Sequence, residues 1–139
     1  MTALEGTGGC AAMMYTSDHG EDIFDDHRNL FLHASPFPSY WQLHVPLVVW
    51  TSPVYQQHHA DIVTHLAANR HRPAESNSVF HTLLSMGGVA TRYRNDSLSL
   101  ASQSYTDHPR LFIDDHNQPR TYDACMQPID MEQMKKRMK

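Results

Sequence analysis

The sequence is short of charged residues, of basic residues and of long apolar runs, and each shortage excludes a class of protein. Charged residues make up 19% of the 139 residues, and the net charge of -4 provides no basic surface for a nucleic acid. No apolar run approaches the ~20 residues that a transmembrane helix requires. The first ten residues also lack the basic and apolar segments of a secretory signal. As written, the chain is expected to be cytoplasmic and to bind no nucleic acid.

Cysteine is scarce as well, whereas histidine is in clear excess. Cys10 and Cys125 lie far apart in the sequence, which is more typical of two free thiols than of a disulfide. No two cysteines have the close spacing of a structural zinc site. Eleven histidines are present, and most of them are expected to be surface or capping residues. A histidine is a candidate for chemistry only where a suitable neighbour accompanies it.

The most informative stretch is AAMMYTSDHGED, residues 11–22. Its apolar first half predicts a buried strand over 10–16, and Gly20 marks a turn just after it. Open α/β sheets carry their chemistry at the ends of such strands. Asp18 and His19 lie at this end, and a carboxylate beside an imidazole suits zinc or manganese. Two ligands are too few for a closed site. The bland alternative is a loop in which Asp18 caps a turn and His19 is exposed.

Four strings follow one another along the chain, namely YTSDHGED, LFLHASP at 30–36, HVPLVVWTS at 44–52 and SNSVFHTLLSMGGVATRY at 76–93. In this order they resemble the C-terminal part of the sulfatase-like phosphoethanolamine transferases, which belong to the alkaline phosphatase superfamily. The resemblance covers residues 11–115. It implies an α/β fold, with part of an alkaline-phosphatase-like or sulfatase-like sheet and flanking helices.

The resemblance also assigns site residues. In the family, the aspartate and histidine of a DHG motif bind zinc, and these positions match Asp18 and His19. The histidine of a downstream LHG motif lies beside the phosphate or a second metal, and His33 matches it. Ala34 stands where many members have glycine, which alters the local loop. The resemblance therefore implies Asp18 and His19 as the metal pair and His33 as the catalytic residue.

In complete enzymes, the resemblance implies transfer of phosphoethanolamine from a phospholipid donor to an acceptor such as lipid A, through a phosphothreonine. The family's threonine nucleophile, a further acidic zinc ligand and an inner-membrane anchor precede the DHG motif, and the catalytic domain is periplasmic. This chain has no match to the nucleophile, so we expect it to be inactive alone unless a separately encoded upstream half completes it. Two other functions stay open: a fragment of a sulfatase or phosphatase acting on a soluble ester, and a non-enzymatic metal-binding or interaction protein.

The chain is expected to consist of a loose segment over 1–9, the C-terminal part of the catalytic domain over 10–117, and a poorly ordered polar tail over 118–139. The apolar run over 44–52 predicts a strand that is covered on both faces in the complete enzyme. Since some neighbours of that strand belong to the upstream half, the chain alone is expected to expose apolar surface.

Two helices are predicted after this strand. The first begins with an N-cap at Ser52, followed by proline, and runs to about Asn69. The second is capped by Ser76 or Ser78 and ends at Gly87, and its predicted buried face consists of three residues, Phe80, Leu83 and Leu84. Further on, SLSLAS at 97–102 is a candidate strand by alternation, and RLFIDD at 110–115 is a stronger one.

Overall fold

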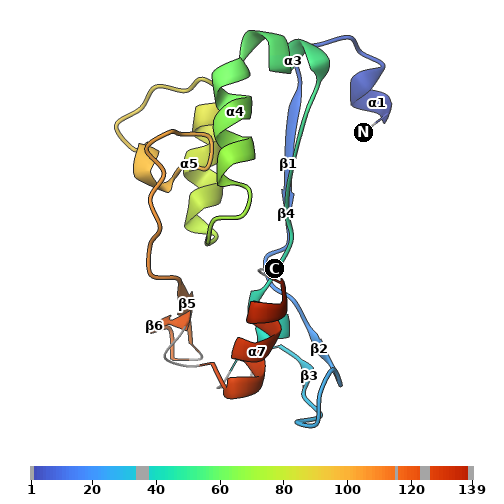
Figure 1. Ribbon diagram of the computed structural model, residues 1–139, viewed down its shortest axis with the longest axis vertical. Coiled ribbons are helices and arrows are strands. Elements are labelled where there is room, and N and C mark those ends of the chain that lie inside the picture. Colours follow the sequence, from blue (N-terminus) through green and yellow to red (C-terminus); the bar gives the residue numbers. More distant parts are fainter. Residues whose placement is uncertain (1, 34–37, 115, 123–125, 138–139) are drawn as a thin grey trace. The chain divides into compact units, whose positions relative to one another are not determined.

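The computed structural model describes the chain except for residues 1, 34–37, 115, 123–125 and 138–139 (Figure 1). It contains short helices and three two-stranded sheets, β1 with β4, β2 with β3 and β5 with β6. In chain order the elements are α1 (Thr2–Glu5), β1 (Ala12–Thr16), β2 (Asp22–Ile23), β3 (Phe31–Leu32), α2 (Tyr40–Leu43), β4 (Leu47–Thr51), α3 (Pro53–His58), α4 (Ala60–Asn69), α5 (Asn77–Met86), the 3-10 helix η1 (Asp96–Leu98), β5 (Leu111–Ile113), β6 (Pro119–Thr121) and α7 (Pro128–Arg137).

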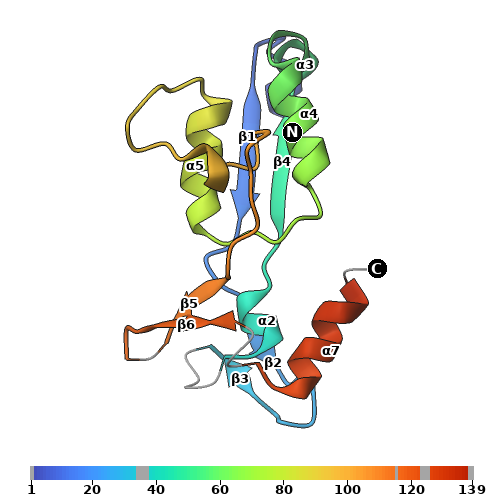
Figure 2. The same cartoon turned by 60° about the vertical axis from the view of Figure 1, so that its left-hand side comes forward.

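The sheet of β1 and β4 is covered by helices on one face. Figure 1 shows this sheet edge-on with α4 and α5 on the same side, and Figure 2 shows the two strands running in opposite directions. The amide of Ser52 donates to the Ala11 carbonyl at 2.8 Å, just beyond the paired strands. A buried cluster of Tyr55, Met86 and Ala101 forms the core under these helices.

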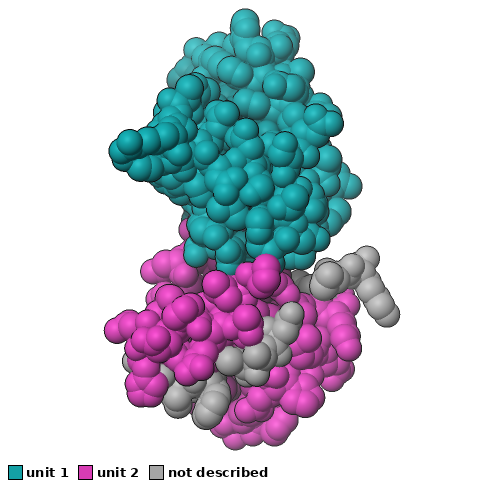
Figure 3. All heavy atoms as spheres, turned by 90° about the vertical axis from the view of Figure 1, so that its left-hand side faces the viewer, with its two compact units in different colours: residues 1–15, 48–108 teal, residues 16–47, 109–139 magenta. Residues whose placement is uncertain are grey.

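The chain divides into two compact units, and each is built from two separate stretches of sequence (Figure 3). Unit 1 comprises residues 1–15 and 48–108, and unit 2 comprises residues 16–47 and 109–139. Unit 1 therefore holds nearly all of the larger sheet and helices α3 to α5, whereas the segment after β1, which contains the DHG motif, belongs to unit 2.

The strand predicted over 44–52 is shorter in the structure, and it is not covered on both faces. Its core is β4, whose five residues are all partly or largely exposed. Val48 is 43% exposed, and Tyr15 on β1 is 56% exposed. The predicted exposure of apolar surface is thus confirmed, and the buried strand predicted over 10–16 is instead a half-exposed one.

The N-cap prediction at Ser52 is confirmed. The Ser52 hydroxyl accepts a hydrogen bond from the Tyr55 amide at 3.1 Å, and Pro53 occupies the first turn of α3. The single helix predicted to Asn69 is instead two helices, because His59 leaves helical geometry with φ -132 and ψ 44. Its amide still bonds the Tyr55 carbonyl, so α3 closes at this residue and α4 begins at the next.

The predicted buried face of the second helix is wrong for Phe80 and Leu83, whereas Leu84 is half-buried. On α5, Phe80 is 52% and Leu83 is 48% exposed, whereas Ser78 and Thr82 are almost fully buried. The reason is that this face of the helix packs on a polar backbone segment, and the Thr82 hydroxyl accepts from the Leu100 amide at 3.0 Å. The predicted end at Gly87 is confirmed, and Gly88 follows in the left-handed region at φ 65.

Of the two strands predicted after α5, the first is wrong and the second is confirmed in part. Residues 97–102 form no strand but the 3-10 helix η1 and turns, in which the Asn95 side chain caps the Ser97 amide. The prediction over 110–115 is confirmed for Leu111–Ile113, which pairs with β6 in an antiparallel hairpin.

The polar tail expected over 118–139 is ordered where the structure describes it. It contains β6 and the ten-residue helix α7, which contacts α2 within unit 2. Asp130 on α7 is 1% exposed. A buried carboxylate must be paired, so specific polar contacts help to hold this helix.

Candidate functional site

The DHG segment lies between β1 and β2, at the start of the long loop region that contains the β2–β3 hairpin and leads to α2. A buried carboxylate fixes this loop. Asp22, 1% exposed, accepts a hydrogen bond from the Ser39 hydroxyl at 2.6 Å and another from the Gln42 side chain. The Ser39 hydroxyl also caps α2 by accepting from the Gln42 amide. Since a buried carboxylate is stable only when its oxygens are hydrogen-bonded, these contacts tie the start of the β2–β3 hairpin to α2.

Gly20 lets the loop approach α2 more closely than any other residue would. Its amide donates to the Gln42 carbonyl at 2.8 Å. A Cβ atom at this position would lie 2.0 Å from the carbonyl oxygen of Trp41, which is far inside contact distance. The glycine of the DHG motif is therefore required by close packing of backbone on backbone.

Asp18 and His19 form a local pair at the open end of this loop. Asp18 Oδ2 lies 3.7 Å from His19 Nε2, and the two side chains are 86% and 40% exposed. On its other side, His19 Nδ1 lies 3.0 Å from the Gly20 carbonyl oxygen. A carbonyl oxygen only accepts, so Nδ1 carries the proton and Nε2 presents its lone pair beside the carboxylate.

The electrostatics of the pair follow from these contacts. The Gly20 carbonyl, followed by the Asp18 and Glu21 carboxylates, raises the pKa of His19. The backbone amide of His19 donates to Asp18 Oδ1 at 3.0 Å, and such bonds lower the pKa of Asp18. The pair thus combines a carboxyl group whose pKa is lowered with an imidazole whose pKa is raised.

His33 is the third residue named from the sequence, and the β2–β3 hairpin brings it next to His19. Asp22 pairs with Leu32 across this hairpin, which brings the residues on either side together. Leu32 has φ 65, which lies in a backbone region that residues other than glycine adopt at a cost in free energy. The His19 and His33 rings consequently lie 3.9 Å apart between centroids, tilted by 36°.

Glu21 completes the cluster, and the sequence reasoning missed it. Its Oε1 atom lies 2.7 Å from His33 Nδ1 and 3.8 Å from His19 Nδ1. His19, Glu21 and His33 each offer a potential ligand atom, and these atoms all lie within 4.8 Å of one another. Two features of the sequence could have indicated this contact. A carboxylate lies two residues after His19, and a histidine lies one residue past the short hairpin.

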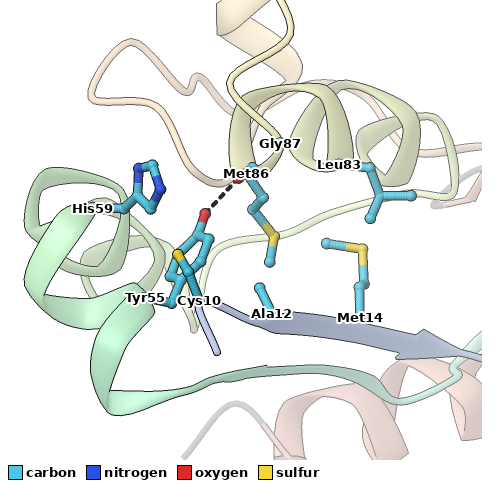
Figure 4. A pocket seen from close by; sticks show the side chains of 8 residues that line it. All are labelled: Cys10, Ala12, Met14, Tyr55, His59, Leu83, Met86 and Gly87. Atoms are coloured by element: carbon cyan, nitrogen blue, oxygen red, sulfur yellow. Dashed lines mark hydrogen bonds between the residues drawn. The ribbon is translucent and has the colours of Figure 1, made fainter. Parts of the chain in front are cut away.

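Unit 1 contains a pocket that includes none of the residues of this cluster. It is a pocket of ≈ 390 Å³ between β1 and helices α3 and α5 (Figure 4). The hydroxyl of Tyr55 donates to the Met86 carbonyl at 2.6 Å within it. Its lining residues include no carboxylate and none of the residues named from the sequence: Cys10, Ala12, Met14, Tyr55, His59, Leu83, Met86 and Gly87. It is therefore not the site that the DHG segment indicates.

Comparison with known proteins gives matches of sequence and of fold. The family model described as Sulfatase matches residues 1–89. The phosphoethanolamine transferase EptA of Salmonella typhimurium is 31% identical over 88 residues, which is 59% of this chain and 15% of that protein. The match thus covers a small part of the curated relative.

The crystal structure of the C-terminal periplasmic domain of EcEptC from Escherichia coli matches with a TM-score of 0.74 at 19% identity, over 88% of this chain and 35% of that one. The structure of the same domain in complex with Zn matches with a TM-score of 0.73. This likeness establishes the α/β fold, with a partial sulfatase-like sheet and flanking helices. None of the helices in the described part of the chain has the length and hydropathy needed to cross a bilayer.

Proposed function

The chain belongs to the sulfatase family, and on this premise we propose that it supplies the C-terminal, metal-binding part of a phosphoethanolamine transferase. The observation that carries the proposal is the arrangement of Asp18 and His19 at the end of β1. The named relative, a phosphoethanolamine transferase, supports the reaction, and the periplasmic domain of EcEptC supports the periplasm as its compartment. Residues 10–117 would form this part of the catalytic domain.

The donor set fits a divalent metal of the zinc type. A zinc ion held by nitrogen and oxygen ligands at about 2.0–2.2 Å keeps its ligand atoms roughly 3.4 Å apart. Asp18 Oδ2 and His19 Nε2 are 3.7 Å apart without a metal, so a small side-chain rotation brings them to that spacing. The Gly20 carbonyl bonded to Nδ1 is the outer contact that orients metal-binding histidines. Carboxylate and imidazole also suit manganese.

Two protein ligands leave the rest of the coordination sphere to other residues or to substrate. A metal bound here would supply Lewis-acid stabilisation of the phosphoryl oxygens. Exposure of both side chains leaves the site open to a large substrate such as a phospholipid headgroup or lipid A. His33, 47% exposed, would donate a hydrogen bond to the transferred phosphoryl group or protonate the leaving oxygen.

The nucleophile is not among the residues that this cluster brings together. We therefore propose that the chain by itself binds metal but does not turn over a phosphoester, and that donor and acceptor bind only to the complete enzyme.

Zinc titration by calorimetry tests the proposal. The expected result is binding that falls at least tenfold in both Asp18→Ala and His19→Ala. Asp25→Ala and His27→Ala are matched controls, because they remove the same residue types from exposed positions of the same loop. Binding that is equally strong in Asp18→Ala and in the controls would refute the proposed metal pair.

A turnover assay on the unmodified chain tests the second half of the proposal. No release of a phosphoester product is expected with zinc present. Turnover that disappears in His19→Ala would contradict the claim of inactivity and show that the chain contains its own nucleophile.

A further inference from the structure

We propose that Glu21 is a positioning residue that fixes the orientation and the tautomer of His33. The inference rests on the proposed function, because it concerns the residue assigned to the phosphoryl group there. It adds a role for a carboxylate that the metal pair does not use.

The geometry of the contact is that of a hydrogen bond. Glu21 Oε1 and His33 Nδ1 are 2.7 Å apart, and the side chains are 39% and 47% exposed. The two residues are 12 positions apart in sequence, so the β2–β3 hairpin is what brings them together. A carboxylate that is ionised at neutral pH only accepts hydrogen bonds, and the proton must therefore reside on Nδ1.

This assignment decides which nitrogen meets the substrate. With Nδ1 bound to Glu21, the Nε2 atom of His33 is the one left to face a phosphoryl or leaving oxygen, and it donates to that oxygen in the doubly protonated imidazolium form. His19 follows the same rule, since the Gly20 carbonyl holds its Nδ1. Both imidazoles thus use Nδ1 to bind the loop and keep Nε2 for ligands.

A metal bridging His19, Glu21 and His33 is the competing interpretation of the same cluster. Their potential ligand atoms lie within 4.8 Å of one another. Two contacts favour the hydrogen bond instead. The 2.7 Å spacing of Glu21 and His33 is shorter than the roughly 3.4 Å between ligands of one zinc ion. The Gly20 carbonyl already occupies the nitrogen of His19 that faces Glu21.

Nitrogen-15 NMR of the histidine side chains distinguishes the two tautomers directly. In the metal-free chain, at a pH where the imidazoles are neutral, His33 is expected to carry its proton on Nδ1. Glu21→Ala is expected to convert His33 to the Nε2-protonated form. The result is read without an activity measurement, so the experiment does not depend on whether the chain turns over a substrate.

Two histidines serve as internal references in the same spectra. His81 Nδ1 accepts from the Asn95 amide at 3.1 Å, so His81 must be protonated on Nε2. His19 should keep its Nδ1 proton in Glu21→Ala, because the Gly20 carbonyl is still present, and this shows that the loop remains folded. Asp25→Ala is the control for loss of a loop carboxylate.

An Nε2-protonated His33 in the unmodified chain would overturn the proposal, as would an unchanged tautomer in Glu21→Ala. Displacement of the His33 Nδ1 proton by zinc would favour the bridging metal and likewise overturn it. Zinc binding that persists in Asp18→Ala would count against the proposed function alone, so the two failures can be told apart.

Discussion

Removal of the Arg28 side chain is predicted to destabilise unit 2 and to remove the part of its acid sensitivity that comes from Asp26. The guanidinium lies between two carboxylates, with Nη2 2.6 Å from Asp26 Oδ2 and 2.8 Å from Asp130 Oδ1. A second bond joins Nη1 to Asp130 Oδ2 at 2.9 Å. Arg28 and Asp26 are each 12% exposed and Asp130 is 1% exposed, so water screens these charges little.

The magnitude follows from what Arg28→Met leaves behind. Asp130 would lose its cation and, among the residues that the structure describes, keep the backbone amides of Tyr40 and Gln127 as donors. Breaking a buried ion pair from one side costs ~3–5 kcal/mol. At pH 7 the free energy of unfolding of unit 2 is therefore expected to fall by about 3 kcal/mol.

The acid dependence has a sign that can be worked out. The Arg28 side chain lowers the pKa of Asp26 from 3.8 to about 2. A carboxyl whose pKa is lower in the folded state stabilises that state above its unfolded pKa, and this is lost as the pH falls from 3.8 toward 2. At 1.36 kcal/mol per pKa unit, the contribution is about 2 kcal/mol. Arg28→Met should remove this part of the acid dependence.

Urea unfolding followed by tryptophan fluorescence measures both effects. The chain has two tryptophans, and Trp50→Phe leaves Trp41 of unit 2 as the only reporter. Lys136→Met is the control, because Lys136 and Glu132 are 60% and 63% exposed in their ion pair and such pairs contribute less than ~1 kcal/mol. A loss below 1 kcal/mol in Arg28→Met, or an unchanged acid slope, would refute the reasoning.

Two more substitutions test contacts that fix the loop and the helix. Gly20→Ala should lower the unfolding midpoint reported by Trp41, because the added Cβ would clash with the Trp41 carbonyl and the hydrogen bond to Gln42 would be lost. Gly9→Ala is the control, because a Cβ there would meet the Thr7 hydroxyl at 3.2 Å. Equal midpoints for the two variants would contradict the close approach. Thr82→Val should cost ~1–3 kcal/mol in urea unfolding, because it leaves the Leu100 amide buried without its acceptor. A cost near zero would mean that water replaces the hydroxyl.

The features that the sequence predicted correctly are those decided by neighbouring residues. Ser52 before a proline makes an N-cap wherever the helix packs, and paired glycines end a helix because they adopt backbone angles that other residues avoid. Asp18 and His19 are adjacent in sequence, so their side chains can lie close together once the chain leaves strand geometry.

The features that were missed depend on partners distant in sequence. The buried face of α5 differs from the predicted one because the Thr82 hydroxyl accepts a hydrogen bond from the Leu100 amide, 18 residues away. The periodicity of the helix sequence does not reveal this contact. The order of α7 follows from Asp130 bonding Arg28, 102 residues away. Glu21 was overlooked because only the hairpin brings His33 to it. In each case the deciding contact is a polar one between residues distant in sequence, which a local sequence pattern does not reveal.

The contact between Asp130 and Arg28 has a consequence for how the protein is made. Unit 2 consists of residues 16–47 and 109–139, with most of unit 1 encoded between them. During synthesis the loop that carries His19 emerges first, but its anchor on α7 does not exist until about a hundred further residues have followed. Contacts between such distant segments form slowly, because a long loop must close before they stabilise anything. Unit 1 can assemble its helices in the meantime, whereas the segment with the DHG motif stays without its anchor and accessible to chaperones and proteases. The order of translation thus delays the maturation of the site relative to the rest of the chain.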